Sequence, residues 1–230
     1  MMKNISRRDM LTGFAAGAAS AAGALQSGCA QEGISAAGPE ALPKWRNEEF
    51  YKDGKLDAEA TKQAYYTLMA CHGFPIFPVL KTDEFWTLDF ALGEFTEVGM
   101  GGIFYINNKR DNYMLHDIWL LPGQMIPEHI HVRHEDVAPK MEAWLVRHGM
   151  AYIYSFGKGT AEDEERIPAT HRKIALARKA AKTLPGQVVR LEVAEQQHWM
   201  LAGPQGAIVT EVATYHSMDA LKFTHPDIKL

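Results

Sequence analysis

The stretch PEHIHVRHEDVAPKMEAWLVRHG, residues 127–149, contains four histidines and four acidic residues. In a β-strand, residues i and i+2 point to the same face. His129 and His131 therefore aim to one side of a predicted strand, which is good geometry for two ligands of one metal ion.

The acidic partner of this histidine pair is less clear from the strand pattern alone. Glu142 begins an apolar strand, EAWLVRHG, which runs to a predicted turn at Gly149 before a second apolar strand, MAYIYSF. A hairpin neighbour of the His-x-His strand would bring Glu142 beside the imidazoles. The other candidates of the stretch are expected to lie opposite the pair, in loops or at the surface: Glu128, His134, Glu135, Asp136 and His148.

The rest of the chain predicts a mostly β fold with a few N-terminal helices. Segments rich in β-branched and aromatic residues alternate with Gly, Pro and Asn, which is typical of an antiparallel sandwich or barrel. They are GIFYINN, NYMLHDIWLLPG, EAWLVRHGMAYIYSFG, QVVRLEVAEQQHW and GAIVTEVATYH. A helix is expected over residues 57–73, with Asp57 as N-cap and Gly73 at its C-terminal end. Residues 160–184, charged and Ala-rich, are expected to form an inserted loop with a short helix.

The first residues have the layout of an export signal. Arg7 and Arg8 in SRRDML precede an uncharged Gly/Ala-rich run, as in twin-arginine signal peptides. Residues 1–29 are therefore predicted to be a signal peptide and residues 30–45 a linker, leaving residues 46–230 as a single domain. The protein is expected in the periplasm, or anchored outside the cytoplasmic membrane if Cys29 is lipidated. The net charge of −4, without a basic block, argues against a nucleic-acid partner.

A wider pattern resembles the first cupin motif. Gly123, five residues and His-x-His match G-x5-H-x-H. Glu142 and Gly149, with six residues between them, match E-x6-G, although ten residues separate His131 from Glu142. The resemblance implies a double-stranded β-helix (jelly-roll-like) barrel, Glu142 as the acidic ligand and one further histidine from a second motif. His198, after Gly186 and a predicted strand, fits that role. Three imidazoles and a carboxylate, with two open positions, suit Mn(II), Fe(II), Zn(II) or Co(II).

The finer pattern resembles the D-lyxose ketol-isomerase family of cupin sugar isomerases. The similarity covers residues 95–228 through LPGQMIPEHIHV, KMEAWLV, LPGQ, HW, EVATYH and MDALKFTHP, and includes the long gap before Glu142. It implies aldose–ketose isomerisation of D-lyxose- or D-mannose-like sugars through an enediol. It also implies Mn(II) as the metal on His129, His131, Glu142 and His198.

Isomerisation moves a proton between C1 and C2, so the site needs an acid–base pair. Lys140 faces the same way as Glu142 and is the candidate acid or cationic partner. Glu211, on a strand expected to line the barrel, is the candidate base. Asp219 and Phe223 are candidate substrate-binding residues that close one end of the pocket.

Two other functions remain open on the sequence. One is another cupin metalloenzyme, either a dioxygenase or a lyase of the dimethylsulfoniopropionate type; a lyase would use a tyrosine base such as Tyr152, Tyr154 or Tyr215. The other is a non-catalytic sugar-binding cupin. A homodimer paired through edge strands is also left open. Because twin-arginine export carries folded proteins, Mn(II) would be loaded before transfer, avoiding competition from Cu(II) or Zn(II).

Overall fold

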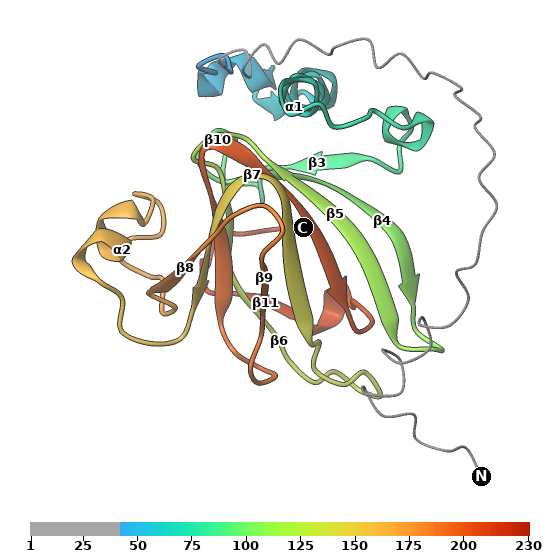
Figure 1. Ribbon diagram of the computed structural model, residues 1–230, viewed down its shortest axis with the longest axis vertical. Coiled ribbons are helices and arrows are strands. Elements are labelled where there is room, and N and C mark those ends of the chain that lie inside the picture. The colour runs from blue at the N-terminus through green and yellow to red at the C-terminus, as the bar shows by residue number, and fades with distance from the viewer. Residues whose placement is uncertain (1–41) are drawn as a thin grey trace, which may run out of the picture. The chain divides into compact units, whose positions relative to one another are not determined.

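Strands dominate residues 42–230, the part of the chain that the computed structural model describes (Figure 1). The predicted signal peptide and most of the predicted linker lie outside the described residues. The main strands are β3 (Trp86–Leu88), β4 (Met100–Asn108), β5 (Tyr113–Leu120), β6 (Met125–His131), β7 (Glu142–Ser155), β8 (Lys179–Thr183), β9 (Val188–Arg190), β10 (His198–Ala213) and β11 (Leu221–Phe223). The smaller elements are η1 (Asn47–Phe50), β1 (Tyr51–Lys52), β2 (Lys55–Leu56), α1 (Ala58–Cys71), η2 (Pro78–Lys81), α2 (Ala161–Arg166) and η3 (Met218–Ala220). The predicted mostly β fold is confirmed.

The strands curl into a barrel with two walls, all pairs within the walls being antiparallel. The first wall has the order β9, β7, β10, β5, β4 and β3, and the second has β11, β6, β10, β7 and β8. β7 and β10 are long enough to belong to both. They pair with each other along most of their length and bend together where they pass from one wall to the other.

Two glycines allow the backbones of β7 and β10 to pack closely at that bend. Gly149 and Gly206 have φ of 71°, in the left-handed region, where glycine is the favoured residue. A Cβ at Gly149 would come 2.1 Å from the carbonyl oxygen of Gly206. The predicted turn at Gly149 is therefore wrong, because the glycine bends one continuous strand. The expected hairpin with the His-x-His strand is also wrong: β6 pairs with β10 and β11.

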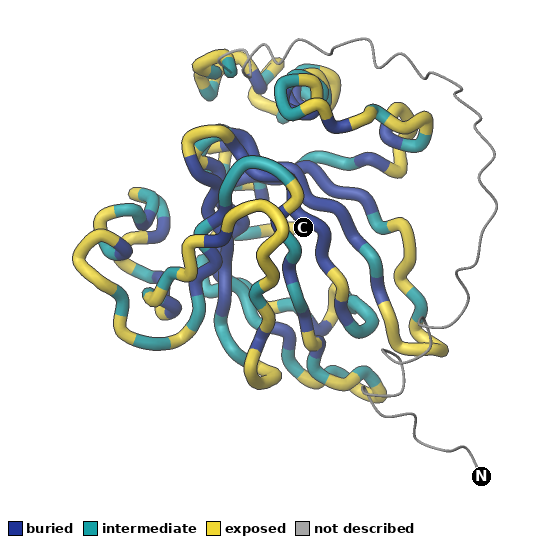
Figure 2. The backbone as a smooth tube through the Cα atoms, in the orientation of Figure 1, coloured by how far each residue is buried: buried dark blue, intermediate teal, exposed yellow. Residues whose placement is uncertain are grey.

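Helix α1 covers the outside of the first wall. Asp57 caps its N-terminus by accepting hydrogen bonds from the backbone N–H of Glu59 and Ala60. Its buried face, which includes Tyr65 and Leu68, packs in a core outside the barrel with Trp119 and Ile208 of β5 and β10. Figure 2 shows the buried residues of the barrel and, separately, the buried side of α1. The predicted helix and its cap are confirmed.

The second core includes inward-facing strand residues such as Ile118 and Ile153 and extends outside the barrel to Ile167 of the segment 160–184. The segment 160–184 contains α2 and β8, and β8 adds to the second wall beside β7. The expected short helix is confirmed, but the segment ends as a paired strand rather than a loop. Within residues 42–230, no helix has the length and apolar character needed to cross a membrane.

Candidate metal and sugar site

The candidate metal ligands come from both walls of the barrel. His129 and His131 alternate along β6 toward the interior, and His198 pairs with His129 on the neighbouring strand β10. Glu142 begins β7 in the first wall, beside Ala213 at the far end of β10. One ligand atom from each of the four side chains lies within 4.8 Å of all the others. The barrel therefore brings together the four predicted residues.

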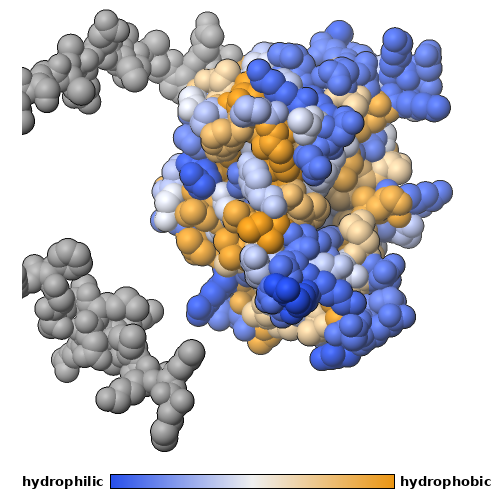
Figure 3. Space-filling view, turned by 90° about the vertical axis from the view of Figure 1, so that its right-hand side faces the viewer, coloured by the Kyte–Doolittle hydropathy of each residue, from blue (hydrophilic) through white to orange (hydrophobic). Residues whose placement is uncertain are grey.

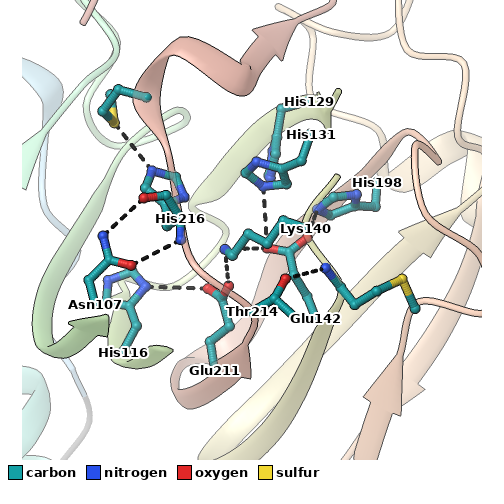
Figure 4. Close-up of polar contacts among 12 residues, drawn as sticks. Asn107, His116, His129, His131, Lys140, Glu142, His198, Glu211, Thr214 and His216 are labelled. Atoms are coloured by element: carbon teal, nitrogen blue, oxygen red, sulfur yellow. Dashed lines mark hydrogen bonds and ion pairs between the residues drawn. The ribbon is translucent and has the colours of Figure 1, made fainter. Parts of the chain in front are cut away.

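Glu142 contacts both His131 and His198 (Figure 4). Its Oε2 is 2.9 Å from Nε2 of His198 and its Oε1 is 3.3 Å from Nε2 of His131. The side chain is 2% exposed, and burial alone would raise the pKa of its carboxyl group. Lys140 and the two imidazoles outweigh that effect and hold the pKa of Glu142 well below its usual range. The carboxylate is thus ready to bind a cation at neutral pH.

Backbone carbonyls orient two of the imidazoles. Nδ1 of His129 lies 2.9 Å from the carbonyl oxygen of Pro127, and Nδ1 of His198 lies 2.9 Å from that of Gln196. A carbonyl oxygen only accepts, so Nδ1 carries a hydrogen, which leaves Nε2 as the nitrogen available to a metal ion. Metal-binding histidines commonly have such a partner on the second nitrogen. The donor set therefore fits a divalent metal ion held by three imidazoles and a carboxylate.

Lys140 and Glu211 lie beside the cluster. Nζ of Lys140 donates to Oε1 of Glu142 at 2.6 Å and to Oε1 of Glu211. Burial alone would lower the pKa of Lys140, but the two carboxylates outweigh it and raise the pKa above its usual value. Both residues predicted as the acid–base pair are buried and joined by an ion pair.

Two residues of the site were not predicted. His116 of β5 is stacked on Phe104 at 4.3 Å between ring centroids, and its Nδ1 lies 3.3 Å from Oε2 of Glu211. His216, beyond β10, also stacks on Phe104, at 5.4 Å, and its ring lies 5.4 Å from that of His131. The alternation of His116 with Met114 and Ile118 along one strand face was a signal that it points inward.

Comparison with known proteins identifies the family to which the chain belongs. No protein-family model matches it. The D-lyxose/D-mannose isomerase of Thermosediminibacter oceani is 31% identical over 141 residues, which are 61% of this chain and 76% of that protein. The D-lyxose ketol-isomerase of a Thermofilum species is 30% identical over 141 residues, covering 61% and 77%. The chain belongs to the D-lyxose ketol-isomerase family. It is a sugar isomerase.

Solved structures support the fold of this D-lyxose ketol-isomerase family member. The L-ribose isomerase of Cellulomonas parahominis, solved with L-ribose, superposes with a TM-score of 0.55 at 14% identity, covering 73% of this chain and 90% of that one. The L-ribose isomerase of Acinetobacter sp. DL28 gives a TM-score of 0.52 at 13% identity, covering 68% and 79%. The predicted cupin-type barrel is confirmed.

The cluster of this family member forms part of the wall of a cavity of about 510 Å³. Lys140, Glu211 and His116 line it, as does Phe223 of β11, whose ring lies 5.9 Å from that of His129. Asp219 of η3 is exposed and is not among the cavity-lining residues. The structure therefore brings Phe223, but not Asp219, to the cavity.

The tyrosines that a lyase would need do not line this cavity. Tyr154 faces the outside of the second wall, where it stacks on Trp199 and donates to the carbonyl oxygen of Asp163. Tyr152 packs against Arg166. None of the tyrosines among residues 42–230 is a cavity-lining base, so the lyase alternative loses its catalytic group.

Glu128 lies on the opposite face of β6 from the histidines, as predicted, but its expected place at the surface is wrong. It is fully buried and accepts hydrogen bonds from the backbone N–H of Leu176 and Ala177 and from Oγ1 of Thr224. The segment 160–184 docks on this carboxylate. The remaining candidates of residues 127–149 lie away from the cluster: His134, Glu135, Asp136 and His148.

Proposed function

We propose that the protein is a metal-dependent aldose–ketose isomerase that acts on D-lyxose- or D-mannose-like sugars through an enediol. The observation that carries the proposal is the position of Lys140, which joins Glu142 of the four-residue cluster to Glu211 inside the cavity. Burying an ammonium group between two carboxylates costs free energy of folding. Binding a sugar without catalysis does not require this arrangement, whereas proton transfer does.

The donor set supports a resident divalent ion, which we propose to be Mn(II), with Zn(II), Fe(II) and Co(II) as alternatives. His129, His131, Glu142 and His198 would hold it. When bound, the ion supplies Lewis-acid stabilisation of negative charge on the two adjacent sugar oxygens.

The protein's own groups move the protons. Glu211 removes the hydrogen from C2 of the open-chain aldose as a proton, and the electron pair of that bond forms the C1–C2 double bond. The carbonyl oxygen O1 takes a proton from Lys140, which gives the enediol. Return of the O2 proton to Lys140, with transfer of the proton from Glu211 to C1, completes the ketose and restores both groups. His116 holds Oε2 of Glu211 while Lys140 holds Oε1, so the base is fixed at both oxygens.

Incubation of the metal-loaded protein with D-lyxose, D-mannose and D-xylose, with measurement of ketose formation, tests the proposal. Turnover of D-lyxose or D-mannose is the expected result, and its absence after chelation shows metal dependence. No ketose from any of the three sugars, alongside oxygen uptake or dimethyl sulfide release, would overturn the proposal.

We also propose that the protein is exported in the folded state with its metal bound. The support is the twin arginine pair, Arg7 and Arg8, and an N/O ligand set that binds Cu(II) or Zn(II) more tightly than Mn(II). Exchange of the signal for one that exports unfolded chain should lower Mn content and activity. Unchanged Mn content would contradict the proposal that the metal is bound before export.

An exposed apolar row supports a homodimer, which we propose as the assembly. Ile106, Leu115 and Val212 are paired across β4, β5 and β10 and therefore lie on one face of the first wall. Val212 is 56% exposed. Figure 3 shows several groups of hydrophobic residues, separated by hydrophilic ones, on one side of the molecule. Val212→Glu should convert the dimer to a monomer in light scattering; a wild-type monomer would contradict the proposal.

A further inference from the structure

The cavity wall away from the metal cluster is almost entirely apolar. Its side chains come from β3, β4, β5, β6, β7 and β10: Leu88, Met100, Ile118, Ile126, Ile153 and Met200. These six side chains offer no N–H or O–H donor and no oxygen acceptor to a sugar hydroxyl. A sugar whose first two carbons face the cluster must place its far end along this surface.

Apart from Lys140 and Glu211, two charged residues line the cavity outside the cluster, Asp89 and Lys229, besides the rings of Trp86 and Trp144. Asp89 accepts hydrogen bonds from the Tyr51 hydroxyl at 2.7 Å and from the backbone N–H of Ala91 at 2.9 Å. Lys229 is exposed next to the C-terminal residue. Neither provides a buried partner for a hydroxyl at the far end of the substrate.

His116 and His216 lie at the end of the cavity that is next to the metal cluster. Nδ1 of His116 faces Glu211, and its Nε2 packs against Trp86 and Gly102, where a Cβ on the glycine would lie 2.6 Å from the nitrogen. Nδ1 of His216 has no hydrogen-bond partner among the described residues, and its ring lies close to that of His131. The polar groups of the cavity therefore gather at the end of the substrate that carries the reacting carbons, whereas the apolar wall meets the terminal carbon.

We infer that the preferred substrate is a 6-deoxyaldose, whose terminal carbon is a methyl group; the inference rests on the proposed isomerase function. A hydroxyl buried without a partner loses its hydrogen bonds to water, whereas a methyl group gains from burial against the apolar wall. An apolar pocket rejects an analogue with one added hydroxyl by roughly 10- to 100-fold.

The test compares sugars that differ only at carbon 6. The matched pairs are D-mannose with 6-deoxy-D-mannose and L-galactose with 6-deoxy-L-galactose. For whichever configuration reacts, kcat/KM of the deoxy sugar should be at least about tenfold higher. Equal values, or a preference for the 6-hydroxy sugar, would overturn the inference and leave the proposed function standing. If these four sugars and D-lyxose all give no ketose, the proposed function itself fails.

Two variants test whether the apolar wall is the cause. Leu88→Gln and Met200→Gln place a hydrogen-bonding amide on different strands of the wall, with Leu88→Met and Met200→Leu as apolar controls. Thermal unfolding verifies that each variant is folded. At least one Gln variant should reduce the preference for the deoxy sugar several-fold while both controls retain it. An unchanged preference in both folded Gln variants would overturn the role of the wall.

Discussion

Nζ of Lys140 lies 2.6 Å from Oε1 of Glu142, and neither residue is more than 5% exposed. The same nitrogen contacts Glu211, so one buried cation serves two carboxylates that come from different strands. Glu142 belongs to the proposed metal site and Glu211 is the proposed base. Lys140 therefore couples the metal site to the proton transfer.

Lys140→Met should lower kcat by roughly 10²- to 10⁴-fold, the usual contribution of a positioned acid–base group. The metal content should stay close to the wild-type value, because all four ligands remain. Lys109, an exposed lysine paired with Asp136, provides the control Lys109→Met, which should keep full activity. Steady-state kinetics and elemental analysis measure both quantities. Wild-type kcat in a folded Lys140→Met protein would exclude the lysine from the reaction.

His116 is expected to act as a positioning residue for Glu211. His116→Leu removes the hydrogen bond to Oε2 and should lower kcat about tenfold with little change in KM, because the proposed base is misaligned while sugar binding is kept. His116→Gln retains an N–H donor and should recover part of kcat. A purely structural role would instead lower the unfolding temperature of both variants equally, without the difference in kcat.

Metal removal should reduce stability as well as activity. A ligand at 100 times its Kd stabilises the folded state by about 2.7 kcal/mol, which for a domain of this size is about 5–10 °C in Tm. Chelation should lower Tm by that amount and abolish turnover, and Mn(II) should restore both. His129→Ala should remove the effect of chelation on Tm. A Tm that does not respond to chelation or to Mn(II) in the wild-type protein would argue against a bound ion.

Much of this site could be predicted from the sequence because its residues follow local rules. Strand alternation pairs His129 with His131, and alternation again turns Lys140 the same way as Glu142. Alternation could have turned His116 inward, but its place beside Glu211 depends on the pairing of β5 with β10, which no local pattern specifies. His216 was missed because it lies beyond β10, where its backbone is held by the side chain of Asn107 of β4.

The wrong predictions for Gly149 and Glu128 also arose because strand pairing and tertiary contacts decide these positions. Gly149 was expected to end a strand, since an isolated glycine in an apolar run often marks a turn, but the pairing of β7 with β10 continues through it. Glu128 was expected at the surface because alternation places it outside the barrel. The segment 160–184 then covers it, and that docking depends on tertiary contacts rather than on residues near Glu128.

Glu128→Ala should destabilise the protein by roughly 3 kcal/mol, since the backbone N–H groups of Leu176 and Ala177, the latter buried, lose their acceptor. The segment 160–178 should also become sensitive to limited proteolysis. Glu165→Ala, an exposed position in the same segment, is the matched control and should change neither property. Chemical denaturation gives the free energy of unfolding, and mass spectrometry locates the cleavage. Equal stability of the two variants would show that the carboxylate does not hold the segment.

His171 should make the folded state sensitive to acid. Burial, together with the nearby His225, lowers the pKa of His171 from 6.5 to about 4. Its Nδ1 contacts Oγ1 of Thr170, which also donates to Glu97, while its Nε2 has no hydrogen-bond partner among the described residues. A proton on Nε2 would therefore be buried without an acceptor.

The unfolded chain takes up this proton near pH 6.5 and the folded protein only near pH 4, so the contribution of His171 to stability is complete above pH 6.5 and is lost as the pH falls toward 4. Tm measured across this range should fall less steeply in His171→Gln than in the wild-type protein. His134→Gln, in the loop after β6, is the control and should keep the wild-type slope. Parallel curves for His171→Gln and the wild-type protein would show that this imidazole does not titrate between folded and unfolded states in that window.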